Sequence, residues 1–104
     1  MMTLKSTDVE LLEKKYSIYL LLAIENNPGK NKLEITNLEN TGTKSKSIRI
    51  DELIKAGLVE TEYLGKYNAS ALRLTEKGRQ IAVKLKKIRY ILLKDNIEME
   101  NDEE

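Results

Sequence analysis

The residues that decide the fold are 41–60, with the sequence TGTKSKSIRIDELIKAGLVE. Apolar side chains recur in this stretch at helical spacing, which predicts a helix over residues 44–56. The side chains that this helix turns inward are Ile50, Leu53 and Ile54. Gly57 follows at the position where many helices end in a left-handed residue, a conformation that suits glycine. The stretch therefore predicts a helix that stops at Gly57 and leads directly into an extended segment.

A second, shorter helix is predicted just before this one, over residues 32–39, with Leu33, Ile35 and Leu38 as its apolar positions. Residues 41–43, Thr-Gly-Thr, predict a tight turn between the two helices. Two helices joined by a short turn that contains glycine are typical of a helix-turn-helix unit.

Further toward the N-terminus, residues 7–26 predict one long helix. Thr7 and Glu10 have the spacing of a capping box, in which each side chain bonds the other residue's backbone amide. The helix is apolar nearly all round after Tyr16, so we expect it to be central and buried. The sequence Asn-Asn-Pro-Gly at residues 26–29 ends it.

On the other side of Gly57, residues 58–64 and 70–75 predict two strands joined by a turn at 65–68. Leu72 and Leu74 alternate with a polar residue, as in a strand with one buried face. A final helix is predicted from residues 75–76 to about residue 94. The tail 95–104 has no apolar periodicity, and we expect it to be disordered.

The composition excludes several kinds of site. The chain has 104 residues, the length of one domain, and it contains no Cys and no His. Disulfides, thiol nucleophiles, imidazole bases and Cys/His metal sites are therefore impossible. No paired groups suited to acid–base catalysis occur either. We expect a protein that is not an enzyme, needs no metal or cofactor, and, lacking a long apolar run, is cytoplasmic and not membrane-bound.

The net charge of +1 hides an uneven distribution of charge. Residues 44–94 contain 13 bases and five acids, whereas 95–104 contain six acids and no base. Such an asymmetry indicates a polyanion as partner, although solvated lysine-rich helix faces would show the same excess. The acidic tail can either compete with that partner or keep the protein in solution.

Three local sequences resemble the winged helix-turn-helix regulators of bacteria and archaea, in particular the MarR-like and PadR-like ones. They are LLAIENNPG at 21–29, LIKAGLVE at 53–60 and LRLTEKGR at 72–79. The resemblance implies an α+β, mostly α fold over residues 1–94, with a two-stranded wing and long flanking N- and C-terminal helices. It also implies a sequence-specific regulator that binds double-stranded DNA as a homodimer. The alternative is a winged-helix module that binds another protein.

The same resemblance implies where DNA would bind: at the start of the helix 44–56, which enters the major groove, and at the wing. The implied contacts are Lys44, Ser45, Lys46, Ser47, Ile48, Arg49, Lys66, Tyr67, Asn68 and Arg73. One departure concerns this helix: the families usually have an apolar residue at the position of Lys46, and here the apolar residue is Ile48. Ile48 can therefore face DNA or the core. Acids at Glu52, Glu60 and Glu62 would repel phosphates and favour the protein-binding alternative.

The final helix has apolar residues on two faces. Ile81, Leu85, Ile88 and Leu92 form one stripe, which we expect to face the core. A small monomer has little left to cover the second face, so we expect a partner chain there. The predicted dimer interface is Leu11, Ile18, Leu22, Val83, Tyr90, Ile91 and Leu93. In the alternative, the first helix covers both faces within one chain. No residue pattern identifies a small-molecule effector.

Overall fold

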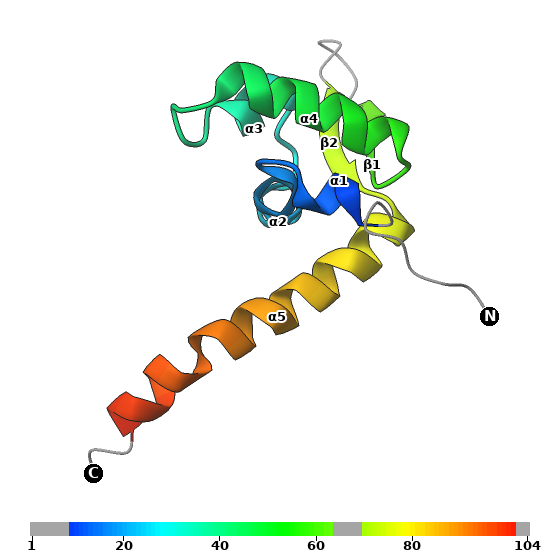
Figure 1. The fold of residues 1–104 in the computed structure, drawn as a ribbon. Coiled ribbons are helices and arrows are strands. Elements are labelled where there is room, and N and C mark those ends of the chain that lie inside the picture. The colour runs from blue at the N-terminus through cyan, green and yellow to red at the C-terminus, as the bar shows by residue number, and fades with distance from the viewer. Residues whose placement is uncertain (1–8, 64–69, 102–104) are drawn as a thin grey trace, which may run out of the picture.

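The computed structural model describes residues 9–63 and 70–101, with side chains as far as Lys94. These residues form five helices and one hairpin (Figure 1). In chain order the elements are α1 (Glu10–Glu13), α2 (Ser17–Asn26), α3 (Lys32–Thr36), α4 (Thr43–Lys55), β1 (Val59–Tyr63), β2 (Ser70–Leu74) and α5 (Glu76–Asn101). The winged-helix architecture that the sequence predicts is therefore confirmed. Among the described helices, none is both long enough and apolar enough to cross a membrane.

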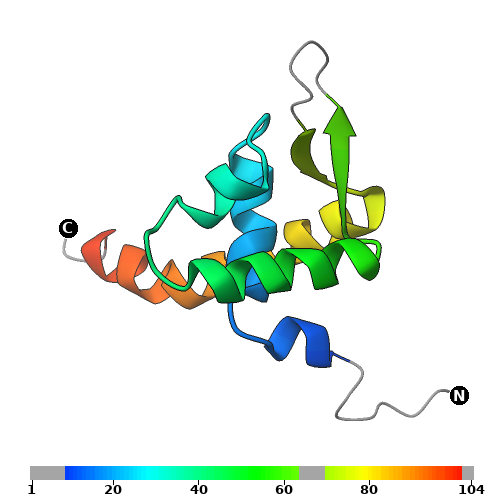
Figure 2. The ribbon, with the colours of Figure 1, turned by 90° about the horizontal axis from the view of Figure 1, so that it is seen from above.

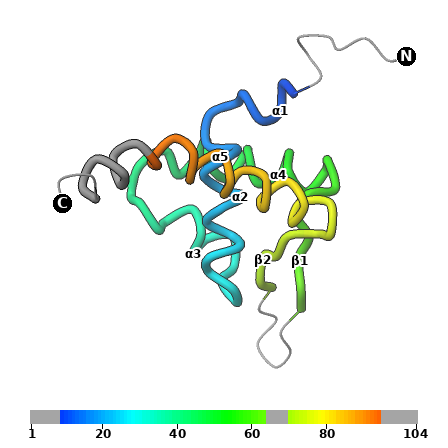
Figure 3. The backbone as a smooth tube through the Cα atoms, turned by 90° about the horizontal axis from the view of Figure 1, so that it is seen from below, coloured from blue at the N-terminus to red at the C-terminus, as the bar shows by residue number. Residues whose placement is uncertain are grey.

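Helix α2 lies at the centre, with α4 on one side and α5 on the other (Figure 1). Seen from above, α3 and the hairpin flank α4 on one side and α1 flanks it on the other (Figure 2). From below, α5 crosses α2, against which it packs (Figure 3). The buried apolar core between these elements consists of Leu20, Leu21, Ile24, Ile35, Ile50, Leu53, Leu58, Val59, Leu72, Leu74, Ala82 and Leu85.

The hairpin is antiparallel, with Val59 opposite Leu74 and Tyr63 opposite Ser70. Its bounds agree with the predicted strands to within one or two residues. The alternation of β2 turns Leu72 and Leu74 into the core, as predicted. The connecting residues 64–69, which include the predicted wing contacts Lys66, Tyr67 and Asn68, lie outside the described part of the chain.

The prediction of one long N-terminal helix is wrong. The helix is interrupted between α1 and α2, where Lys14 is extended and Tyr16 adopts a left-handed conformation with φ of 72°. The buried hydroxyl of Ser17 donates a hydrogen bond to the Leu11 carbonyl and holds the bend. The Tyr16 ring lies against Gly42 and over the Nζ of Lys46, contacts with a distant segment that a local helical pattern does not reveal. Of the predicted capping box, Thr7 lies outside the described residues, and Val9 caps α1 without a side-chain bond.

The final helix begins as predicted, because the Thr75 hydroxyl accepts a hydrogen bond from the Gly78 amide at 3.0 Å and caps it. Two other predictions for α5 are wrong. Ile88 and Leu92 do not face the core: they are 52% and 74% exposed, since α5 projects away from the domain beyond α2 (Figure 1). The helix also continues past Lys94 to Asn101, through residues that contain neither Gly nor Pro to stop it.

Candidate nucleic-acid interface

Helix α4 has one buried and one exposed face. Ile50 and Leu53 are fully buried against α2 and the hairpin. Lys44, Ser45 and Ile48 share the opposite, exposed face near the helix N-terminus, and Ile48 is 50% exposed. Gly42 and Gly57, one on either side of this helix, adopt left-handed conformations with φ of 63° and 79°. This face of α4 therefore presents the Lys44 cation, the Ser45 hydroxyl and the apolar Ile48 side chain to solvent.

The prediction that Lys46 contacts DNA is wrong. Its side chain lies on the buried face of α4 and is 0% exposed. Its Nζ donates to the Glu39 carbonyl oxygen at 3.0 Å, and the rings of Tyr16 and Tyr19 cover it at 5.2 and 4.9 Å. Lys46 thus occupies the core position that the families give to an apolar residue, which leaves the neighbouring Ile48 outside. In this position Lys46 cannot reach a phosphate or a base.

Arg49 and Ser47 stand at the borders of the exposed face, each half-buried. Arg49 Nε donates to the Lys15 carbonyl oxygen at 3.1 Å, and its guanidinium pairs with the Glu52 carboxylate. Lys14 Nζ lies 2.7 Å from the other oxygen of Glu52. The hydrogen bond from Lys14, together with the charge of Arg49, lowers the pKa of Glu52. Arg49 is therefore committed to contacts within the chain.

Three further acids near this surface, Asp51, Glu60 and Glu62, are also paired. Asp51 lies 2.6 Å from Lys32 of α3. Across the hairpin, Arg73 pairs with Glu60 at 2.7 Å and with Glu62 at 3.4 Å. The hydrogen bond to Glu60 and the charges of both acids raise the pKa of Arg73. These pairs neutralise the acids within the chain, and they also occupy Arg73, a predicted DNA contact.

Two basic residues that the sequence pattern did not single out lie beside α4. Lys32 begins α3, and with Leu33, Lys44 and Ser47 it lines a groove between α3 and α4. Lys15 is exposed at the junction of α1 and α2, next to Arg49. Each is separated in sequence from the predicted interface, and only the packing of α1 and α3 against α4 brings it there.

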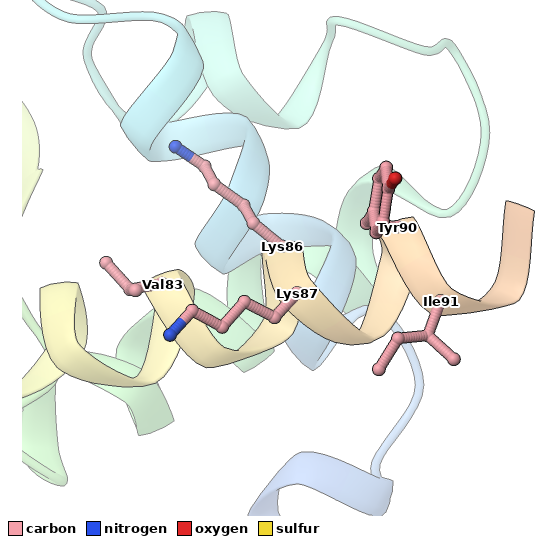
Figure 4. A pocket seen from close by; sticks show the side chains of 5 residues that line it. All are labelled: Val83, Lys86, Lys87, Tyr90 and Ile91. Atoms are coloured by element: carbon pink, nitrogen blue, oxygen red, sulfur yellow. The ribbon is translucent and has the colours of Figure 1, made fainter. Parts of the chain in front are cut away.

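The residues predicted for a dimer interface fall into two groups. Ile18, Val83, Tyr90, Ile91 and Leu93 are exposed. Leu11 and Leu22 are partly buried, because they pack against the core of their own chain. On α5 an open apolar groove is lined by Val83, Lys86, Lys87, Tyr90 and Ile91, whose side chains are shown in Figure 4. The exposed Ile88 and Leu92 extend the apolar surface of this helix beyond the predicted set.

Comparison with known proteins agrees with this architecture. The family model described as ArnR1-like, winged-helix domain matches residues 18–92. No curated protein matches the chain significantly. Among solved structures, a possible HxlR family transcriptional factor from Thermoplasma volcanium is 27% identical, with a TM-score of 0.69 over 92% of this chain and 87% of that chain.

The reduced form of the transcriptional regulator YodB from B. subtilis is 25% identical, with a TM-score of 0.67 over 86% of this chain and 89% of that one. The multiple antibiotic-resistance repressor MarR from Listeria monocytogenes is 22% identical and has the same fold, with a TM-score of 0.62. The matched region covers 89% of this chain and 63% of the MarR chain.

Proposed function

Since the chain belongs to the ArnR1-like winged-helix domain family and resembles solved transcription regulators, we propose that it binds double-stranded DNA sequence-specifically. We further propose that it does so as a homodimer in the cytoplasm, with one domain on each half of the DNA site.

The observation that carries this proposal is the exposed start of α4. The N-terminal residues of a recognition helix are those that reach base edges in the major groove. Lysine can pair with a phosphate or with the O6 and N7 atoms of guanine, and serine can bond either. Ile48 can pack on a thymine methyl group, which is an apolar contact that depends on sequence. Lys44, Ser45 and Ile48 therefore combine affinity with discrimination between bases.

The electrostatics of the surface also favour DNA over a protein partner. The acids that would repel phosphates, Asp51, Glu52, Glu60 and Glu62, all have cationic partners within the chain. Lys44 makes no ion pair with any described residue, so its charge is available to a phosphate. The helix dipole adds partial positive charge at the same end of α4.

The exposed apolar side chains of α5 support the dimer. Tyr90, Ile91 and Leu93 lie close together in sequence and are exposed, on the helix α5 that projects beyond the domain (Figure 1). Contiguous apolar surface of this kind usually marks a contact with another protein. In a two-fold dimer the same patch serves both chains. Such a dimer would place two copies of α4 about 34 Å apart on one side of the DNA.

A charge reversal on α4 tests the proposed interface, with a matched reversal on α5 as control. Lys44→Glu and Lys84→Glu change the net charge equally, but α4 and α5 lie on opposite sides of α2 (Figure 1). In fluorescence anisotropy with a labelled mixed-sequence duplex at low salt, Lys44→Glu should weaken binding by about tenfold or more. Lys84→Glu should stay close to wild type. An equal loss in both variants would show that α4 is not the interface.

A further inference from the structure

Lys46 is a buried cation whose contacts join three segments of the chain. Its backbone amide donates a helical hydrogen bond to the Gly42 carbonyl oxygen at 2.8 Å. Its Nζ holds the Glu39 carbonyl oxygen in the connection between α3 and α4. Tyr16 and Tyr19 cover the same Nζ from the start of α2 and lie edge to face, with ring centroids 6.5 Å apart. Fully buried lysines are rare because removing the ammonium from water is costly.

Tyr16 adds a second cost at the same place. Among the described residues it is the one non-glycine residue with a positive φ, a conformation in which the Cβ of an L-residue crowds the following carbonyl oxygen. Its ring fills the space beside Gly42, the residue that precedes α4. A Cβ at Gly42 would overlap the Tyr16 hydroxyl and lie 2.6 Å from Cζ. The Tyr16 ring thus touches both the N-cap and the first turn of α4.

Stability alone does not account for a lysine at this position. A buried ion can often be replaced by an apolar side chain of similar volume with little loss or even a gain in stability. What an apolar side chain cannot do is hydrogen-bond the Glu39 carbonyl or attract two aromatic faces. These directional contacts fix the α3–α4 connection relative to α2, and the first turn of α4 follows directly from that connection.

We propose that Lys46, held between Tyr16 and Tyr19, is a positioning residue that sets the start of α4 for base recognition from inside the core. The inference rests on the proposed DNA-binding function. Lys44, Ser45 and Ile48 lie within two residues of Lys46 along the helix, so any looseness at Lys46 displaces them. Phosphate contacts tolerate such a displacement better than base contacts do, because only base contacts depend on the exact register in the groove.

The test replaces Lys46 by methionine, whose unbranched apolar side chain reaches as far as Cε but lacks the ammonium. Lys44→Met, two residues away on the exposed face, is the matched control. Lys46→Met should lose about tenfold in affinity for the preferred site, the scale of one good base contact. Its affinity for non-specific duplex and its salt slope should stay at wild-type values. Lys44→Met should lower the salt slope by about 1.8, as expected for one phosphate contact in each half of the dimer.

Amide hydrogen exchange on the DNA-free protein separates this inference from the proposed function. In Lys46→Met the amide of residue 46, the first in α4 to donate a helical hydrogen bond, should exchange faster, while those around Leu53 should not change. Faster exchange in a protein that binds no DNA would refute the DNA-binding function and keep the positioning role. Unchanged exchange with unchanged site preference would overturn the positioning role. A salt slope reduced as in Lys44→Met would also overturn it, since Lys46 would then touch a phosphate.

If Lys46→Met does not fold, Tyr19→Leu is tested instead, with amide exchange and DNA site preference as the two measurements. It removes one of the two rings over Nζ and keeps the charge and Tyr16. Faster exchange at the amide of residue 46 together with a weaker site preference supports the positioning role. Wild-type values for both overturn it.

Discussion

Gly78, in the first turn of α5, lies against the backbone of Leu58, the residue before β1. A Cβ at Gly78 would overlap the Leu58 carbonyl oxygen and lie 3.0 Å from its carbonyl carbon. The same oxygen accepts a hydrogen bond from the Thr75 amide at 3.0 Å. The two segments cannot move apart without losing this bond, so the close approach fixes where α5 leaves the hairpin.

Gly78→Ala should therefore destabilise the protein by about 1–3 kcal/mol, the usual cost of overpacking, even though alanine is the better helix former. Urea unfolding measures the loss. Gln80→Ala, at an exposed position two residues further along α5, is the control and should leave the midpoint unchanged or slightly raise it. A Gly78→Ala variant as stable as the control would show that the backbone of Leu58 adjusts without cost.

Ile48 and Ile50 are two residues apart in sequence but lie on opposite faces of α4, one exposed and one buried. Because Ile48 is 50% exposed and Ile50 is 0% exposed, Ile50→Ala should cost about 2–5 kcal/mol and Ile48→Ala much less. Thermal unfolding compares them. Ile48→Ala should instead relax the preference at one base pair of the DNA site. A loss of about 2 kcal/mol or more in Ile48→Ala would mean that this side chain is part of the core.

Glu52 should make stability depend on pH. Its pKa in the folded protein lies below the ordinary value of 4.5, mainly because Lys14 donates to it. A lowered pKa stabilises the fold above the unfolded-state value, and this contribution disappears as pH falls through the folded-state value. The difference in Tm between wild type and Glu52→Gln should thus be largest near neutral pH and should vanish in acid. A Glu52→Gln difference that is constant with pH would contradict the role of the ion pair.

The dimer proposal predicts that Tyr90→Glu combined with Leu93→Glu gives monomers, because two charges would be placed within the apolar surface of α5. Sedimentation velocity should show a wild-type dimer at tens of micromolar and a monomeric double variant. The variant should also bind DNA weakly although α4 is unchanged. Gln80→Glu controls for an added charge on α5. A monomeric wild type, or a double variant that stays dimeric, would refute this interface.

The sequence predicted those parts of the fold that local residues determine. The end of α4 follows from Gly57, whose φ of 79° is the conformation expected there. The start of α5 follows from the Thr75 cap, and the hairpin follows from the alternation around Leu72. In each case the determining residues lie within a few positions of the feature, so a single sequence is enough.

The features that the sequence did not predict depend on contacts between distant segments. The break at Tyr16 and the burial of Lys46 exist only because Tyr16, Gly42 and Lys46 meet in the fold. The pairing of Arg49 with Glu52 could have been predicted, because the two residues are three positions apart on a helix. The hydrogen bond from Arg49 to the Lys15 carbonyl could not, because the two residues are far apart in sequence. The exposure of Ile88 and Leu92 depends on where α5 leaves the domain. Helical periodicity shows which residues share a face but not where the helix loses contact with the core.

The most direct test of the central claim is enrichment of bound duplexes from a random-sequence DNA pool with the purified protein, followed by sequencing. The account predicts an enriched palindrome whose half-sites are centred about 10 base pairs, or one helical turn, apart. Ile48→Ala carried through the same selection should lose the preference at one position in each half-site. A pool that stays random after repeated selection at moderate salt would contradict sequence-specific recognition, and an enriched site without two-fold symmetry would contradict the dimer.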